Sequence, residues 1–185
     1  QILLLITPLI TTPYVSRVLG ADGIGTVSYA ESIVSYFVLF ATMGITTYGQ
    51  REISYVQQSL EKRSVVFWNT KILEFVTSGV MLIAYLAFAL FQKNSIIYIT
   101  LCCNIVAVFF DISWFFQGLE EFGKIVLRNV IFKLINIAYI FIVVRTKDDL
   151  IWYVVGLTVF SAMSNISLWV YLPKYIIKVR SEEHT

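Results

Sequence analysis

The sequence predicts an all-α membrane protein built from about six transmembrane helices. Hydrophobic residues make up 58% of the 185-residue chain and charged residues only 14%, whereas a soluble domain usually carries about a quarter charged residues. The mean hydropathy of +0.77 is correspondingly high. A soluble fold would need a polar surface that this composition does not supply, so lipid is the expected solvent for the apolar excess.

Six segments are apolar and long enough to cross a bilayer, since a helix needs about 20 mainly apolar residues to span ~30 Å of hydrocarbon. In chain order they are Gln1–Leu19, Gly25–Tyr48, Val65–Phe91, Ser95–Gln117, Ile125–Val144 and Leu150–Leu172. The sixth segment carries no charge, and each of the others carries one or two charged residues. Six crossings would place the two ends of the chain on the same side of the membrane.

The connections between these segments are short and polar, as turns should be. Leu19–Gly25 holds three glycines and an Asp, and the later short connections are Gln92–Asn94, Gly118–Lys124 and Arg145–Asp149. Only Gly49–Ser64 is longer. The spacing of its apolar residues predicts a short amphipathic helix, which we expect on the membrane surface.

Lys and Arg residues are divided unevenly between the two sides of the predicted bundle. One side has seven, namely Arg51, Lys62, Arg63, Lys124, Arg128, Lys174 and Lys178. The other side has four, namely Arg17, Lys93, Arg145 and Lys147. Because cytoplasmic loops carry the excess of positive charge, both ends of the chain are expected in the cytoplasm.

Both ends of the chain are expected to be truncated. Gln1 already lies in an apolar run, with no initiator Met and no signal-peptide layout before it. The last six residues, 180–185 (RSEEHT), resemble the translation of a sequencing adapter. We therefore expect a transmembrane lobe of residues 1–179, followed by a non-native tail that holds the sole histidine, His184.

Polar residues inside the predicted helices follow one stripe on each helix, as the 3.6-residue period allows. From the second segment to the sixth, they are Ser28, Glu31, Ser32, Ser35 and Thr42; Lys71, Glu74 and Ser78; Asn104 and Asp111; Asn129, Lys133 and Asn136; and Ser161, Ser164 and Asn165. These faces are expected to meet protein or water rather than lipid.

The charged members of these stripes are expected to pair, because an unpaired charge at mid-membrane costs about 2.5–3.5 kcal/mol. Four of them share one level toward the cytoplasmic side, namely Lys71, Glu74, Asp111 and Lys133. Arg17 and Glu31 lie nearer the other side and are expected to form a separate pair. Two interpretations stay open: these groups line a translocation cavity or carry a coupling ion, or they are ion pairs that hold the helices together.

Several classes of function lack their residues here. The chain has no glycine-rich phosphate loop and no HExxH, CxxC or GxSxG motif, so neither ATP-driven chemistry nor an enzyme centre is expected, and no cofactor or metal is expected. Cys102 and Cys103 are adjacent and point to different helix faces, which disfavours a disulfide or metal site. A net charge of +2 without a basic run argues against a nucleic-acid partner.

Five motifs stand in a familiar order along the chain. They are Pro13–Gly25 (PYVSRVLGADGIG), Ala30–Tyr36 (AESIVSY), Gly44–Ile53 (GITTYGQREI), Trp114–Gly118 (WFFQG) and Glu120–Lys133 (EEFGKIVLRNVIFK). Together they make the chain similar to the Wzx-type oligosaccharide flippases, the polysaccharide-transport branch of the multidrug/oligosaccharidyl-lipid/polysaccharide exporter superfamily. The resemblance covers nearly the whole chain up to its tail.

The resemblance implies one half of a two-lobe, pseudo-symmetric transporter in the bacterial inner membrane. Such proteins move an undecaprenyl-pyrophosphate-linked oligosaccharide between leaflets by alternating access. The implied partners are this lipid-linked oligosaccharide, membrane lipid, the second lobe of the same chain and the polysaccharide polymerase machinery. Cationic candidates for the substrate headgroup are Arg17, Arg51, Lys71 and Lys133. Acidic candidates for ion coupling or ion pairing are Glu31, Glu74 and Asp111.

Three alternatives remain open beside this interpretation. A drug/cation antiporter of the same superfamily should have an acidic, aromatic cavity, and Lys71 and Lys133 argue against it. A membrane-embedded glycan polymerase or ligase usually carries large periplasmic loops, whereas the outer connections here have only a few residues. A scaffold that does not transport would not need matched charges at one depth.

Overall fold

The computed structural model describes residues 2–177, and this part of the chain is helical without a strand. Its α-helices are α1 (Ile2–Thr42), α2 (Ile45–Val56), α3 (Leu60–Leu90), α4 (Ser95–Phe110), α5 (Ser113–Gly118), α6 (Phe122–Val143) and α7 (Leu150–Ser167). The predicted all-α class is confirmed. The hexapeptide 180–185 with His184, together with Lys178 and Gln1, lies outside the described residues.

Five helical stretches of the described chain are long and apolar enough to cross a membrane. They are Thr7–Val56, Leu60–Leu90, Ser95–Gly118, Phe122–Val143 and Lys147–Lys174. The last four correspond to the third to sixth predicted segments. The first two predicted segments are instead parts of one long helix, so six separate crossings remain a prediction.

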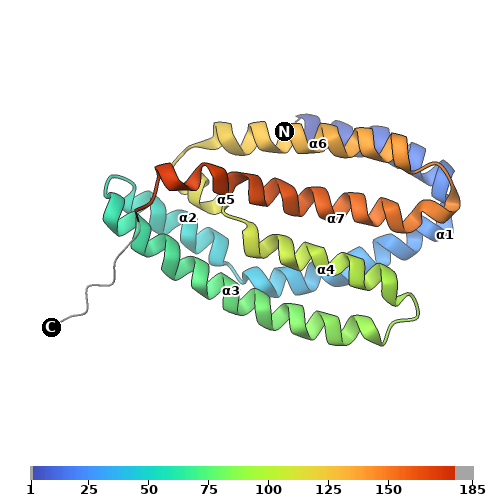
Figure 1. The fold of residues 1–185 in the computed structure, drawn as a ribbon, viewed down its shortest axis with the longest axis horizontal. Coiled ribbons are helices and arrows are strands. Elements are labelled where there is room, and N and C mark those ends of the chain that lie inside the picture. The colour runs from blue at the N-terminus through green and yellow to red at the C-terminus, as the bar shows by residue number, and fades with distance from the viewer. Residues whose placement is uncertain (1, 178–185) are drawn as a thin grey trace.

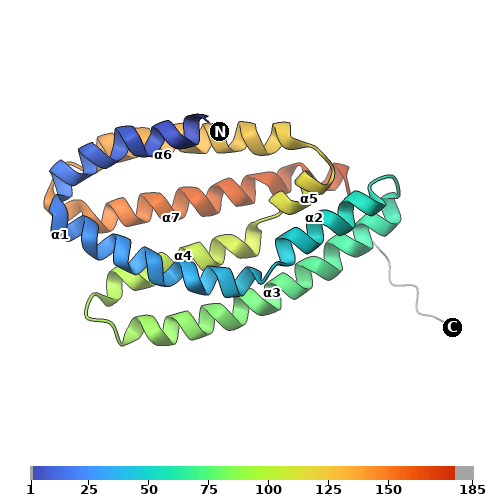
Figure 2. The same ribbon diagram turned by 180° about the vertical axis from the view of Figure 1, so that it is seen from behind.

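α1 is bent at Gly20, where the backbone leaves the helical region at φ 76° and ψ 166°. The two arms of α1 fold back from this bend, so that the first lies along α6 and the second along α3 and α4 (Figures 1 and 2). Val15 in the first arm packs with Ile140 of α6. In the second arm, Val34 packs with Tyr85 of α3 and its neighbours. The predicted turn at Leu19–Gly25 is thus a bend rather than a loop.

Replacing Gly20 with Ala is expected to destabilise the protein. A positive φ combined with ψ near 170° is open essentially to glycine alone, and forcing another residue into it costs about 1–3 kcal/mol. The expected result is a lower melting temperature for the purified full-length protein. The matched control is Gly25→Ala, because no atom lies within 4 Å of a Cβ at Gly25. Equal melting temperatures for the two variants would contradict the role given to the bend.

The predicted amphipathic helix exists as α2, but its apolar face packs on protein. α2 begins after a turn at Met43 and Gly44, both with positive φ, and therefore starts inside the second predicted segment. Ile53 is fully buried in a cluster with Trp114 and Phe116 of α5. α5 thus offers α2 an aromatic surface to cover, while the position of this helix on the membrane surface stays a prediction.

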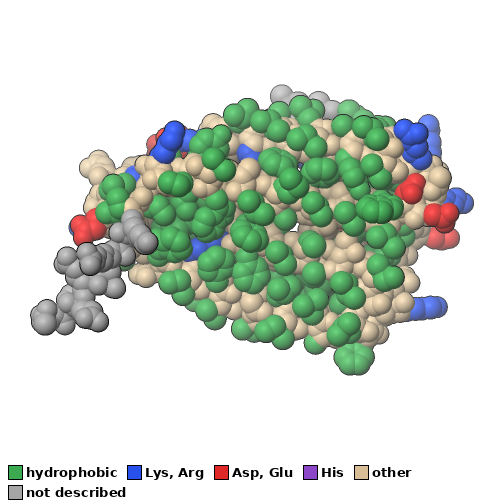
Figure 3. Space-filling model, viewed as in Figure 1, with side chains coloured by type: hydrophobic (Ala, Val, Ile, Leu, Met, Phe, Trp, Pro, Cys, Tyr) green, Lys and Arg blue, Asp and Glu red, His purple; other side chains and the backbone are tan. Residues whose placement is uncertain are grey.

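The connections lie at the two ends of an elongated bundle, and charged side chains gather at these ends. The turns after α2 and α5 lie at one end, while the bend of α1 and the turns after α3 and α6 lie at the other (Figure 1). Hydrophobic side chains cover most of the surface between the ends on the face that Figure 3 shows. Such an outward apolar band is what lipid requires, and the chain is a multi-pass membrane protein.

A polar clasp fixes the segment that follows α7 to the rest of the fold. Arg63 of α3 donates from Nε to the Tyr175 carbonyl at 2.8 Å, and the Ile177 amide donates to Ser64 Oγ at 3.0 Å. The Tyr175 hydroxyl donates to Glu121 Oε1 at 2.9 Å and also contacts Lys124. Lys124 Nζ also lies 3.0 Å from Glu121 Oε2. The hydrogen bonds that Lys124 and Tyr175 donate to Glu121 lower the pKa of this carboxyl group.

Candidate functional site

The fourth predicted segment is broken at Asp111, where the backbone becomes extended between α4 and α5. A helix end leaves carbonyls without intrahelical partners, and inside a membrane these must find other donors. Side chains from α3 and from the α7 end supply them: Asn165 Nδ2 to Ala107 O at 2.9 Å, Trp169 Nε1 to Phe110 O at 2.8 Å, and Lys71 Nζ to Asp111 O at 2.7 Å and Val108 O at 3.5 Å. The break therefore joins three helices.

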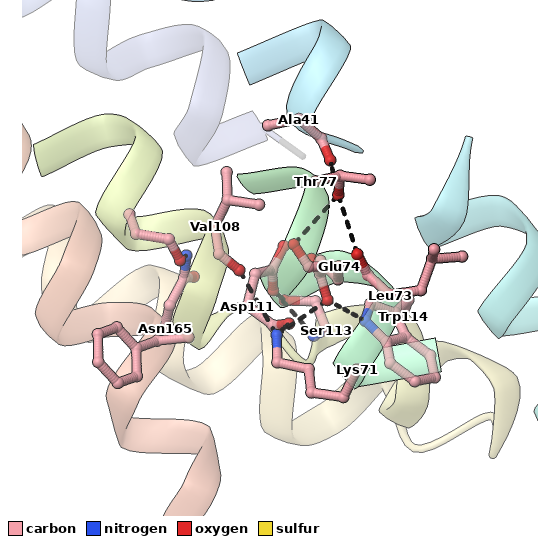
Figure 4. A network of polar contacts seen from close by, with 12 residues as sticks. Ala41, Lys71, Leu73, Glu74, Thr77, Val108, Asp111, Ser113, Trp114 and Asn165 are labelled. Carbon is pink, nitrogen blue, oxygen red and sulfur yellow. Dashed lines mark hydrogen bonds and ion pairs between the residues drawn. The ribbon is translucent and has the colours of Figure 1, made fainter. Parts of the chain in front are cut away.

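Lys71 and Glu74 form an ion pair in the interior of the fold. Lys71 Nζ lies 2.9 Å from Glu74 Oε2, and both side chains are 0% exposed. Trp114 Nε1 donates to the same oxygen at 3.4 Å. Figure 4 shows the ammonium between this carboxylate and the carbonyls at the end of α4. Glu74 accounts for one of the three acceptors around Lys71, so in this conformation the ammonium has no proton left for a ligand.

The Asp111 carboxylate serves both the backbone break and a cavity. Its Oδ1 accepts hydrogen bonds from the Ser113 amide at 2.9 Å and the Ser113 hydroxyl at 2.5 Å, which caps the start of α5. Asp111 also lines a cavity of about 310 Å³. The acid that the sequence placed among the paired charges therefore stabilises the backbone break and also borders the cavity.

The cavity lies between the second arm of α1, α4 and α7. Its lining residues are Val34, Ser35, Val38, Asn104, Ala107, Val108, Asp111, Ser161 and Asn165. The polar members all belong to the stripes predicted from the sequence, which the structure brings to a common surface. No Lys or Arg is among the lining residues, so the cavity wall is polar without being cationic.

Arg128 does not line the cavity but holds Asn165, which does. From the sequence, Arg128 was counted only among the loop cations. It lies in α6 and donates from Nη1 to Asn165 Oδ1 at 3.2 Å and from Nη2 to Asn129 Oδ1 at 2.9 Å. Asn165 is thereby held between Arg128 and the Ala107 carbonyl. The sequence carries no clear signal for this role, because Arg128 lies about 100° around the helix from the stripe that begins at Asn129.

The expected pair between Arg17 and Glu31 does not form. Among the residues that the structure describes, the ion pairs are Arg51–Glu52, Lys71–Glu74 and Lys124–Glu121. The bend at Gly20 separates Arg17 from Glu31: at 1.5 Å per residue they lie about 5 Å and about 16 Å along their arms from it. Arg17 is exposed and Glu31 is half-buried on the second arm of α1.

The remaining cationic candidates lie apart from the cavity. Lys133 is half-buried on α6, and within residues 2–177 its side chain makes no hydrogen bond or ion pair. The four-charge cluster expected at one level thus contains Lys71, Glu74 and Asp111 without Lys133. Arg51, on α2, is 62% exposed and lies 3.5 Å from Glu52.

These features define a multi-pass helical membrane protein with a broken helix and a polar cavity between its helices. The chain matches the family model described as "Polysaccharide biosynthesis protein" over residues 1–184, and it belongs to that family. This confirms the resemblance drawn from the motifs, and it places the chain in the field of polysaccharide biosynthesis and transport.

Two curated proteins are similar to the chain. Both are named "Putative O-antigen transporter": one from Escherichia coli K12 is 26% identical over 147 residues, and one from Shigella dysenteriae is 25% identical over 149 residues. The alignments cover 77% and 78% of this chain but only 35% and 37% of these relatives. The chain thus spans about a third of their length. No solved structure matches it.

Proposed function

We propose that the chain is the first lobe of a flippase, a transporter rather than an enzyme, that moves undecaprenyl-pyrophosphate-linked oligosaccharide across the bacterial inner membrane. The observation that carries this proposal is the polar cavity at the α4 break in a member of a polysaccharide biosynthesis family. Broken helices with irregular backbone at membrane depth occur where they line a cavity or are buried in protein. Both relatives, moreover, bear the name of an O-antigen transporter.

The physical task explains the arrangement. A sugar pyrophosphate cannot cross hydrocarbon, so the protein has to offer a wet, polar path while the lipid tail stays in the bilayer. Two rigid lobes that rock about a site near the membrane centre would provide alternating access. The second lobe would come from the rest of the full-length protein, and the first arm of α1 would add a sixth crossing.

The roles of the charged candidates follow from their surroundings. Arg17, Arg51 and Lys133 keep ammonium or guanidinium protons for a pyrophosphate, whereas those of Lys71 are engaged by the protein. Glu31 and Asp111 are the acidic candidates for a coupling ion, since the Glu74 carboxylate is already neutralised by Lys71. We assign the Lys71–Glu74 pair to the structure of the lobe.

The test uses the full-length gene in a bacterial strain that lacks its own flippase. Arg17→Ala and Lys133→Ala are each expected to lower surface polysaccharide at least about tenfold, because each removes a charge-assisted contact of roughly 1.5–3 kcal/mol. The control is Lys62→Ala, which changes an exposed lysine at the start of α3. Protein level in the membrane is measured in parallel.

If both Arg17→Ala and Lys133→Ala give as much surface polysaccharide as the wild-type protein, neither residue contributes to the transport path. If the intact gene restores no polymer, the flippase proposal fails, and a drug/cation antiporter becomes the better description. Accumulation of an organic cation in the same strain, with and without the intact gene, would then decide that point.

A further inference from the structure

We propose that the cavity between α1, α4 and α7 is a subsite for the uncharged hydroxyls of one sugar of the substrate, and not for its pyrophosphate. This inference rests on the proposed flippase function. It assigns the two chemical parts of the substrate to different places, with the sugar at the α4 break and the anionic headgroup at cations elsewhere.

The lining of the cavity has the composition that a polyol requires. Its polar groups are the amides of Asn104 and Asn165, the hydroxyls of Ser35 and Ser161, and the carboxylate of Asp111. Amides and hydroxyls both donate and accept hydrogen bonds, as sugar hydroxyls do, and a carboxylate accepts from two hydroxyls at once. A pyrophosphate would instead face a carboxylate with no Lys or Arg on the wall, which is repulsive.

A bare metal cation is also a poor occupant, so the coupling ion proposed for Asp111 would be a proton. The carbonyl oxygens at the end of α4, which would be its natural ligands, already accept from Asn165, Trp169 and Lys71. Asp111 is the single carboxylate on the wall, and it interacts electrostatically with both Lys71 and Arg128. The described residues contain no group of three or more acidic, His or Cys side chains that could hold a metal.

Two polar side chains on the wall have capacity left for a ligand. The Asn104 amide makes no hydrogen bond within residues 2–177, although it faces the cavity at membrane depth. The amide is half-buried, so both its donors and its acceptor are open to a ligand that offers hydroxyls. Both hydrogen bonds from Ser113 go to Oδ1 of Asp111, so Oδ2 accepts no hydrogen bond within residues 2–177.

Asn165 is the rigid part of the subsite. Arg128 binds its Oδ1 at 3.2 Å and the Ala107 carbonyl accepts from its Nδ2 at 2.9 Å, so the orientation of the amide is fixed before a ligand arrives. A fixed polar group loses little entropy on binding. The volume of about 310 Å³ has room for a single monosaccharide. The subsite would therefore recognise one residue of the oligosaccharide.

The test measures binding to the purified full-length protein in lipid nanodiscs. The two probes are the undecaprenyl-pyrophosphate-linked repeat unit of the host strain and undecaprenyl pyrophosphate without sugar. Asn104→Leu is expected to weaken binding of the sugar-bearing lipid about 5- to 10-fold, the effect of one lost hydrogen bond, and to leave the sugar-free lipid unaffected. The matched control is Asn136→Leu, the same change in α6 outside the cavity. Asn104→Ser replaces the Leu variant if that one does not reach the membrane.

Each outcome bears on one of the two proposals. If wild-type protein binds neither lipid, the flippase function fails. If it binds both and Asn104→Leu changes neither affinity, the sugar subsite is overturned while the flippase function stands. Asp111→Asn should keep the affinity for the sugar-bearing lipid within about threefold, because an amide still bonds hydroxyls. Loss of that affinity together with a requirement for added Na⁺ would make the cavity a cation site.

Discussion

Replacing Lys71 with Met is expected to remove most of the folded protein from the membrane. Glu74 would then be a carboxylate at 0% exposure whose remaining donor is Trp114 at 3.4 Å. Breaking a buried ion pair by removing one partner costs about 3–5 kcal/mol, since the other charge stays buried without compensation. The carbonyls of Asp111 and Val108 would lose a donor as well.

Two further variants separate charge from packing. Glu74→Gln should cost less than Lys71→Met, because the ammonium keeps its hydrogen bonds to the end of α4. The double variant Lys71→Met/Glu74→Gln should recover part of the loss, since no buried charge then remains. The measurements are the amount of full-length protein in the membrane and its melting temperature in detergent. A double variant less stable than Lys71→Met would contradict the pairing.

Replacing Gly118 with Val is expected to separate α2 from α5. A Cβ at Gly118 would lie 2.6 Å from the Gln50 carbonyl oxygen and 2.8 Å from Ile53 Cβ. The first of these is backbone and cannot move aside as a flexible side chain would. Overpacking a close contact typically costs about 1–3 kcal/mol, and two further methyl groups place Val at the upper end of that range.

Gly123→Val is the matched control, because nothing lies within 4 Å of a Cβ at Gly123. The melting temperature of the full-length protein should fall for Gly118→Val and change little for Gly123→Val. Proteolysis of the α2 region should also speed up in the first variant alone. A stable Gly118→Val protein would mean that α2 and α5 can move apart without loss of the fold.

The all-α membrane class and most helix positions were predictable because they depend only on composition and on the length of the apolar segments. The break of α4 was not predictable in the same way. The sequence around Asp111 carries no glycine or proline, and it reads as a continuous apolar segment with one acid. The break is stabilised by donors from Lys71, Asn165 and Trp169, which lie far away in sequence. Tertiary hydrogen bonds of this kind leave no local pattern.

The candidate site was predictable in its faces but not in its contacts. The 3.6-residue stripes grouped Asn104, Asp111, Ser161 and Asn165 on faces that line one common cavity. Depth along the membrane predicted one true pair, Lys71 with Glu74, which are three residues apart on one helix. It failed for Arg17 with Glu31, since matching depth across a bend depends on how the two arms fold back.

The clasp around Tyr175 has a consequence for the two-lobe transporter that we propose. The segment up to Ile177 is bonded to Arg63 and Ser64 at the start of α3. A pull on that segment would act on α3, which carries Lys71 and Glu74 two to three turns further along. Such a displacement would therefore reach the Lys71–Glu74 pair and, through Lys71, the end of α4.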